Sequence, residues 1–240
     1  MSYPIFLVLS GAAFVVAERL WPRNPGQRLL RRGLTLDLAL LLFHSEIGGW
    51  VVALALSRLI PSAALVPYKL TWLGTAPLWL EVLALWVVKD LVQYGIHNLL
   101  HRVPWLWKFH CVHHTSEELD WLSNWRFHPL ETVVYQSILY VPAFLMGFRW
   151  EASLLCAFLS TGISHFAHAN LRLRVGWLKY VFNTPELHIW HHVHPEAGPQ
   201  NRNFCISFAF WDWMFGTAHC PADPPARIGV RQSESNAKCT

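Results

Sequence analysis

Residues 78–114 read LWLEVLALWVVKDLVQYGIHNLLHRVPWLWKFHCVHH, an apolar run that leads directly into a cluster of histidines. The first half of this stretch is apolar enough to face lipid, whereas Lys89, Asp90 and the histidines that follow need protein neighbours. His97 and His101 are four residues apart, so a helix would place both on one face. The stretch therefore predicts a membrane helix whose inner end carries a polar site.

The composition of the whole chain also indicates a membrane protein. Of its 240 residues, 53% are hydrophobic and 14% are charged, whereas soluble domains contain about 25% charged residues. Fourteen Trp, fourteen Phe and a mean hydropathy of +0.27 fit a surface that faces lipid, with Trp available for the interfaces. The net charge is only +4 and the basic residues are dispersed, which argues against a nucleic-acid partner.

Several apolar runs are long enough to cross a bilayer, which takes about 20 helical residues. Residues 3–17, 34–60 and 77–100 are each predicted to form one crossing. Residues 132–148 and 152–163 are shorter, and they predict either two crossings or a hairpin that enters and leaves on the same side. The sequence thus predicts an all-α integral membrane protein with about four transmembrane helices.

The orientation follows from a group of arginines after the first apolar run. Five arginines lie between positions 19 and 32, and basic loops stay on the cytoplasmic side. Residues 97–131 and 165–240 then share that side and form a cytoplasmic, His-rich helical cap, in what we expect to be a bacterial inner membrane. We expect three regions: N-terminal helices and a loop (1–76), a histidine-bearing domain (77–220) and a flexible tail (221–240).

Eleven of the fourteen histidines lie between positions 97 and 192, and most are spaced for one helix face. A purely structural role would require many imidazoles beside a membrane, where each charged group costs about 2.5–3.5 kcal/mol. Eight or more imidazoles exceed the four ligands of a zinc site, so two metal ions are indicated. Imidazole suits Fe, Cu, Zn and Ni, and the spacing does not choose among them. The groups are His97-x3-His101, His110-x2-His113-His114, His165-x2-His168 and His188-x2-His191-His192.

This ordered set of motifs, placed between apolar runs, resembles the membrane-bound fatty acid hydroxylase and sterol desaturase superfamily of histidine-box, non-haem diiron oxygenases. The resemblance covers residues 78–217 and is specific as a set. Its further pieces are Asp90-x3-Tyr94-x2-His97, Arg126 to Glu131 (RFHPLE), His168-Ala169-Asn170, Asn183 to His188 (NTPELH) and Trp211 to Thr217 (WDWMFGT).

The resemblance implies a ligand set for two irons, with zinc as a possible metal in the purified protein and dioxygen as co-substrate. The metal centre itself, and no separate side chain, is then expected to carry the catalysis. The implied ligands are His97, His101, His110, His113, His114, His165, His168, His188, His191 and His192. Residues expected to support these ligands or to anchor the fold around them are Asp90, Tyr94, His128, Asn170 and Asp212.

The resemblance also implies an activity, in which dioxygen and two electrons hydroxylate a C–H bond of a fatty acyl, sterol or isoprenoid chain. Desaturation at the same centre is the alternative. The chain contains no motif for a flavin, an iron–sulfur cluster or a c-type haem. A separate electron donor is therefore expected, either a ferredoxin or a b-type cytochrome with its reductase. Its expected docking residues are Arg126, Arg172, Arg174 and Lys179.

Three other classes of protein also place histidines beside lipid. A zinc-dependent membrane hydrolase would carry H-E-x-x-H, which is absent. A metal transporter or metal store would line several spans with polar residues, whereas here His44 and Glu46 are the main such pair within a span. A b-type haem protein needs two histidines per haem and leaves the H-x-x-H-H triplets unexplained.

Overall fold

A computed structural model describes residues 2–48, 75–133 and 146–231, together with the single positions 51, 54 and 58. This part of the chain is helical and contains no β-strand, which confirms the predicted all-α class. The expected apolar runs at 34–60 and 132–148 extend beyond the described residues, and so does the expected tail, of which residues 232–240 lie outside them.

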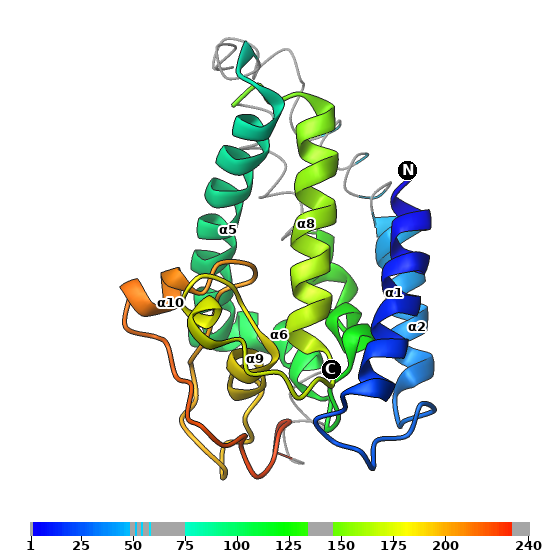
Figure 1. The fold of residues 1–240 in the computed structure, drawn as a ribbon, viewed down its shortest axis with the longest axis vertical. Helices are drawn as coiled ribbons and strands as arrows, with labels where there is room; N and C mark the ends of the chain where they lie inside the picture. Colours follow the sequence, from blue (N-terminus) through cyan, green and yellow to red (C-terminus); the bar gives the residue numbers. More distant parts are fainter. Residues whose placement is uncertain are drawn as a thin grey trace.

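Three long helices and the shorter helix α2 lie roughly alongside one another and form one half of the molecule (Figure 1). They are α1 (Tyr3–Leu20), α2 (Leu34–Leu42), α5 (Leu78–Arg102) and α8 (Trp150–His168), and α2 continues into the π-helical turn η1 (Phe43–Gly48). Helix α8 packs against both α5 and α1. The C-terminal ends of α1, α5 and α8 all lie at the same end of the molecule (Figure 1).

Short helices gather at that end and form the part that we call the cap. They are α6 (Pro104–His114), η4 (Trp121–Trp125), η5 (Gly176–Tyr180), α9 (Pro185–His191) and α10 (Phe210–Met214). Pro104 and Pro185 begin α6 and α9, where a missing N–H costs nothing. The Thr184 side chain caps α9 by accepting a hydrogen bond from the Leu187 amide at 3.4 Å.

By length and composition, α1 is the one described helix that is apolar enough to cross a membrane. The run Leu34–Ser45 is also apolar but shorter. The long helices α5 and α8 contain more polar residues, although Glu81 and Asp90 are buried inside the protein. The predicted four crossings therefore go beyond what the described helices establish.

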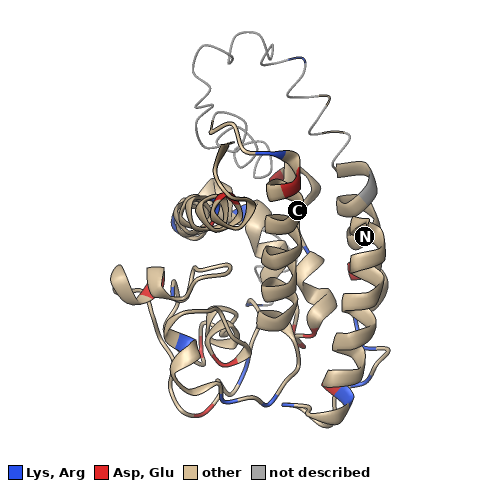
Figure 2. Ribbon diagram, turned by 45° about the horizontal axis from the view of Figure 1, so that its top comes forward, with Lys and Arg blue, Asp and Glu red and all other residues tan. Residues whose placement is uncertain are grey.

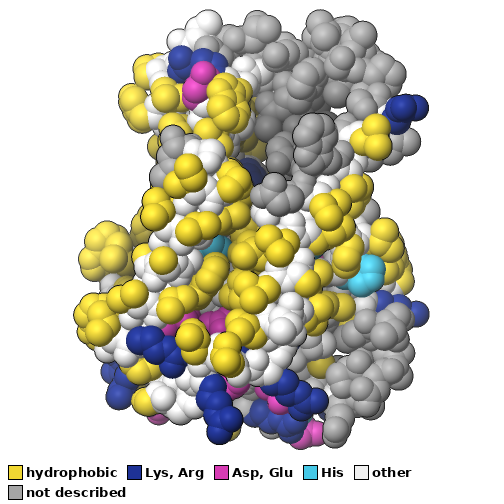
Figure 3. Space-filling view, turned by 90° about the vertical axis from the view of Figure 1, so that its right-hand side faces the viewer, with side chains coloured by type: hydrophobic (Ala, Val, Ile, Leu, Met, Phe, Trp, Pro, Cys, Tyr) yellow, Lys and Arg dark blue, Asp and Glu magenta, His cyan; other side chains and the backbone are white. Residues whose placement is uncertain are grey.

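Most of the charged surface lies at the cap end of the molecule, with a smaller charged spot at the opposite end (Figure 2 and Figure 3). Lys and Arg gather at the cap end (Figure 2), and hydrophobic side chains cover much of the face seen in Figure 3. Large apolar side chains on the long helices are freely exposed, among them Val8, Trp79 and Trp150. This distribution suits a bundle set in lipid with its cap in water.

Buried ion pairs connect the N-terminal helices to the cap. Arg31 pairs with Asp37 and Asp120, and Arg126 pairs with the same Asp37. Arg126 is only 5% exposed, so the prediction that it helps to dock an electron donor is wrong. Its guanidinium is engaged by Asp37 within the protein. The Glu18 carboxylate of α1 adds a second connection by accepting the amides of Trp121 and Asn170.

Candidate metal centre

Nine histidines lie in two groups inside the cap, and within each group the potential ligand atoms are within 4.8 Å of one another. The five-histidine group contains His97, His101, His110, His114 and His191, and the four-histidine group contains His113, His168, His188 and His192. Only His101 is half-buried and the other eight are buried. The structure thus brings together nine of the ten histidines predicted as ligands.

Four helices supply most of these histidines from their last turns. His101 lies at the end of α5, His113 and His114 at the end of α6, His168 at the end of α8, and His191 at the end of α9. The C-terminal end of a helix carries a partial negative charge, which favours a cation nearby. The helix ends that converge here therefore favour metal binding electrostatically.

Hydrogen bonds from the protein fix which ring nitrogen of several histidines faces the group. The Nδ1 atoms of His97, His168 and His191 each lie 2.7–2.9 Å from a backbone carbonyl oxygen. His110 Nδ1 lies 2.8 Å from the Glu131 carboxylate. Carbonyl and carboxylate oxygens accept hydrogen bonds, so Nδ1 carries the proton in these rings and Nε2 keeps its lone pair.

The distances between facing nitrogens match ligands that share an ion. His97 Nε2 lies 3.1 Å from His110 Nε2, and neither atom has a proton to donate. Two nitrogens about 2.0–2.1 Å from one metal at a right angle would be about 3 Å apart. In the four-histidine group, His168 Nε2 lies 3.2 Å from His113 Nε2 and 2.9 Å from His188 Nε2.

Unpartnered nitrogens provide the test of whether a metal fits. The Nε2 atoms of His101, His114 and His191 are buried without a hydrogen-bond partner, which would cost about 1–3 kcal/mol each. Burial lowers the pKa of His113, His114, His188 and His192 well below its ordinary value and that of His191 to about 3. Neutral imidazoles with free lone pairs are what metal binding requires, so these residues fit two metal ions.

Asp90 and Asp212 support the centre through the backbone and do not contact its imidazoles. Asp90 accepts the amides of Ser207 and Phe208 at 2.7 and 2.9 Å. Asp212 accepts the amides of Phe204 and Cys205, each at 2.8 Å. Because the Phe204 carbonyl binds His97, the two carboxylates position a ligand through segment 204–208.

Tyr94 and Asn170 also act at a distance from the imidazoles. The Tyr94 hydroxyl lies 2.8 Å from Thr217 Oγ1, and Thr217 donates to Asp212 at 2.6 Å. The Asn170 amide group exchanges two hydrogen bonds with the backbone of Asn24. Tyr94 thus braces the Asp212 carboxylate, and Asn170 anchors the loop between α1 and α2.

The structure does not bring His165 or His128 into either group. His165 Nε2 accepts from the Trp125 indole at 2.8 Å, and its Nδ1 lies 3.1 Å from Ser10 Oγ. Both ring nitrogens of His165 are therefore engaged elsewhere. His128 is half-buried and its Nδ1 accepts from the Leu130 amide at 3.2 Å.

Sequence reasoning missed Glu131 and Asn183. Glu131 binds His110, and Asn183 Nδ2 lies 3.4 Å from His188 Nδ1 while donating to the Cys205 carbonyl at 2.9 Å. A signal for both was present, because Glu131 ends the RFHPLE motif and Asn183 begins NTPELH. The backbone carbonyls that bind His97, His168 and His191 leave no such signal.

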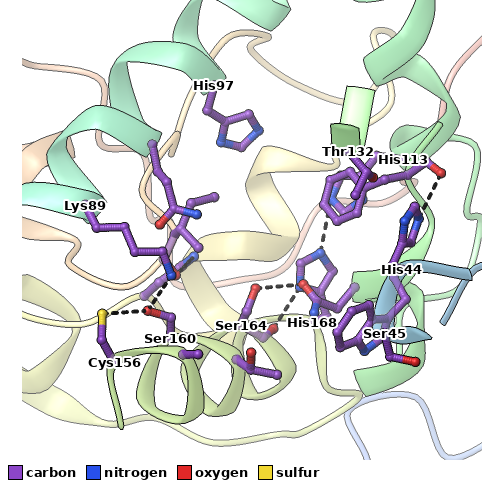
Figure 4. Close-up of a pocket in the computed structure, with 18 of the residues that line it drawn as sticks. His44, Ser45, Lys89, His97, His113, Thr132, Cys156, Ser160, Ser164 and His168 are labelled. Atoms are coloured by element: carbon purple, nitrogen blue, oxygen red, sulfur yellow. Dashed lines mark hydrogen bonds between the residues drawn. The ribbon is translucent and has the colours of Figure 1, made fainter. Parts of the chain in front are cut away.

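A cavity of about 490 Å³ leads to both histidine groups. Its walls come largely from α5 and α8, and they include apolar residues such as Leu85, Leu154 and Ala157. His97 and His110 of one group and His113, His168 and His188 of the other line it as well. Figure 4 shows part of this lining, with His168 and His113 at one side and Lys89 at the other.

Comparison with known proteins gives one family and several relatives. The profile of the family described as fatty acid hydroxylase matches residues 82–217. Ornithine lipid hydroxylase OlsE of Rhizobium tropici is 28% identical over 221 residues, which cover 89% of this chain and 64% of that protein. Alkylglycerol monooxygenase of Xenopus tropicalis is 26% identical over 62% of this chain and 32% of its own length.

A very-long-chain aldehyde decarbonylase of Oryza sativa subsp. indica is 23% identical over 56% of this chain and 22% of that protein. The chain thus spans less than two thirds of the length of these relatives. No solved structure matches it.

Proposed function

The chain belongs to the fatty acid hydroxylase family, and from that premise we propose that it is a membrane-bound diiron oxygenase that hydroxylates a C–H bond of a lipid. The family membership confirms the resemblance seen in the histidine spacing. The observation that carries the proposal is the pair of imidazole groups at the end of a cavity lined by apolar residues. Two relatives are named as a lipid hydroxylase and a monooxygenase.

We assign nine histidines as iron ligands, five in one group and four in the other. Two bound irons would supply the reduction of dioxygen that oxidation of an unactivated C–H bond needs. The protein orients the rings through Glu131 and the carbonyls behind Nδ1, so that Nε2 faces inward. His165, whose nitrogens bond to Trp125 and Ser10, is assigned to holding α8 against η4 and α1.

The lining of the cavity supports a lipid substrate. Its apolar walls suit a fatty acyl, sterol or isoprenoid chain and keep water from the reacting carbon. The same centre would also serve desaturation, which differs in whether oxygen enters the product.

We further propose that the protein crosses a bacterial inner membrane about four times with the cap in the cytoplasm. The arginines between positions 19 and 32 lie at the cap end, where basic loops favour the cytoplasm. A separate ferredoxin or b-type cytochrome with its reductase would then deliver electrons to the cap. Arg172 and Arg174 are exposed there and available to an acidic donor.

The proposal is tested by iron content and by the fate of dioxygen. Protein purified anaerobically from iron-57-grown cells should contain two non-haem irons per chain by Mössbauer spectroscopy. Lipids of cells with and without the gene, grown under ¹⁸O₂, should differ by a product that carries one ¹⁸O atom. Purified protein should form this product only when a reduced ferredoxin is added.

Matched variants separate metal loss from general damage. We expect His114→Gln and His192→Gln, one from each group, to lose iron and product. His219→Gln, whose histidine lies in neither group, should retain both. One zinc or a haem per chain would overturn the proposal in favour of a hydrolase or a cytochrome, and a desaturated product without ¹⁸O would support the alternative reaction.

A further inference from the structure

The cavity contains a cationic side chain that the metal centre does not use. Lys89 lies on α5, and its Nζ donates to Ser160 Oγ of α8 at 3.2 Å (Figure 4). Both residues line the cavity. No carboxylate in the described part of the chain forms an ion pair with Lys89, because both oxygens of neighbouring Asp90 bind backbone amides. Lys89 is half-buried, and the Asp90 charge that acts on it is already bound by backbone amides. An anionic ligand in the cavity would therefore give the lysine a direct ion pair that the protein does not provide.

Gln93 provides a second, independent observation in the same place. It lies one turn after Lys89 on α5, is 7% exposed, and lines the cavity. Its Oε1 is buried and has no hydrogen-bond partner. Buried side-chain amides are normally satisfied, and an amide oxygen only accepts hydrogen bonds, so the position beside Gln93 calls for a hydrogen-bond donor of a ligand.

The polar patch formed by Lys89, Gln93 and Ser160 lies at a fixed distance from the metal ligands. Lys89 precedes His97 by eight residues on α5, and Ser160 precedes His168 by eight residues on α8. Eight helical residues span about 12 Å along the axis. The one cavity contains both ends of this interval, so a single extended molecule can contact the patch and the histidine groups together.

We infer that Lys89, together with Ser160, binds an anionic oxygen group, a carboxylate or a phosphate, of the lipid substrate, and that Gln93 Oε1 accepts a hydrogen bond from a hydroxyl or N–H group of the same substrate. The inference rests on the proposed function for the identity of the ligand as a substrate. An ammonium offers three donors and no acceptor, so its natural partner is an anionic oxygen. Binding that group at the patch selects which carbon, about 12 Å away, reaches the histidines. A site of this kind discriminates against neutral lipids, whose binding would leave the lysine unpaired.

Binding of matched lipids to the iron-loaded protein in detergent tests the inference. The probes are oleate, its uncharged methyl ester, and oleoyl lysophosphatidic acid, each titrated while tryptophan fluorescence is followed. We expect at least one acid to bind roughly tenfold or more tightly than the methyl ester. Preference for oleate identifies a carboxylate site, and preference for lysophosphatidic acid alone identifies a phosphate site.

Variants of Lys89 test whether this residue causes the preference for the acid over the methyl ester. Lys89→Met keeps the length of the side chain and should abolish the preference for the acid, whereas Lys89→Arg should retain most of it. Lys108→Met, which changes an exposed lysine on α6, is the matched control. An unchanged preference in Lys89→Met, with helix content and iron content also unchanged, would overturn the inference.

The same measurements separate this inference from the proposed function. If the iron-loaded protein oxidises no lipid but Lys89-dependent binding of the acid persists, the proposed reaction fails and the anion site stands. If the iron and the ¹⁸O product are present but no acid is preferred over the ester, the reaction stands and the anion site fails.

Discussion

Glu131 contributes a negative charge to the metal centre through a single contact. Its Oε1 accepts from His110 Nδ1 at 2.8 Å, while its Oε2 is buried without a partner. Carboxylates behind metal-bound histidines fix the ring and raise its basicity, and their loss typically costs 10- to 100-fold in metal affinity. We therefore expect Glu131→Gln to lower iron affinity by about that factor, measured by chelator competition.

The same substitution at an exposed glutamate far from the centre is the matched control. Glu151 is exposed in the first turn of α8, so Glu151→Gln should leave iron affinity unchanged. Equal affinities in the two variants would show that the Glu131 carboxylate does not support the ligand.

The histidines show how far residue spacing can predict a site. Intervals of three and four residues place side chains on one helix face, and nine histidines found this way do gather in the structure. His165 has the same spacing to His168, yet it faces Ser10 of α1, because three residues on a helix also turn the side chain by about 60°. The contact from His110 to Glu131 joins separate elements, so spacing cannot predict it.

Segment 204–208 links α5, α10 and the five-histidine group. Asp90 of α5 and Asp212 of α10 accept amides from opposite ends of the segment, and the Phe204 carbonyl binds His97. In Asp212→Asn, the side-chain NH2 group would face a backbone N–H that an oxygen accepts in the unsubstituted protein. The protein would thus lose one charge-assisted hydrogen bond, which is worth about 1.5–3 kcal/mol. We expect a fall of about 5–10 °C in Tm together with partial loss of iron.

Thermal unfolding and iron analysis of Asp212→Asn are compared with those of Asp223→Asn, whose aspartate is exposed. A lower Tm with full iron content would mean that the segment stabilises the fold without positioning His97. The resemblance to the family implied that Asp90 supports the ligands or anchors the fold around them. It did not predict the Ser207 amide, which lies 117 residues further along the chain.

The N-terminal helices and the histidine domain form one packed body in the described residues. Helix α1 contacts α8 and η4, and α2 contacts η4. Asp37 of α2 pairs with both Arg31 and Arg126, and Asp120 supplies the second negative charge of this network. The sequence predicted the all-α class correctly. It assigned Arg126 to a docking surface, because a buried guanidinium is recognisable only once its carboxylate partner is located. The profile match covers residues 82–217, so α1 and α2 lie outside it although they pack against the elements that it covers.

The direction of the helices yields a prediction for the membrane topology. Helix α8 has 19 residues and is about 28 Å long, close to the 30 Å thickness of the hydrocarbon core. Glu151 lies at its start and Glu117 in the cap, and both are exposed. If α8 crosses the bilayer, a cysteine at each position should react with an impermeant maleimide from opposite sides.

In intact spheroplasts, we expect Glu151→Cys to be labelled and Glu117→Cys to be labelled only after permeabilisation, with the unsubstituted chain as the blank. Labelling of Glu117→Cys in intact spheroplasts would reverse the orientation, because the arginine-rich loop lies at the same end as the cap. Labelling of both positions only after permeabilisation would mean that α8 enters and leaves from one side. The cavity between α5 and α8 would then open toward one leaflet only, which would restrict the substrate to lipids of that leaflet.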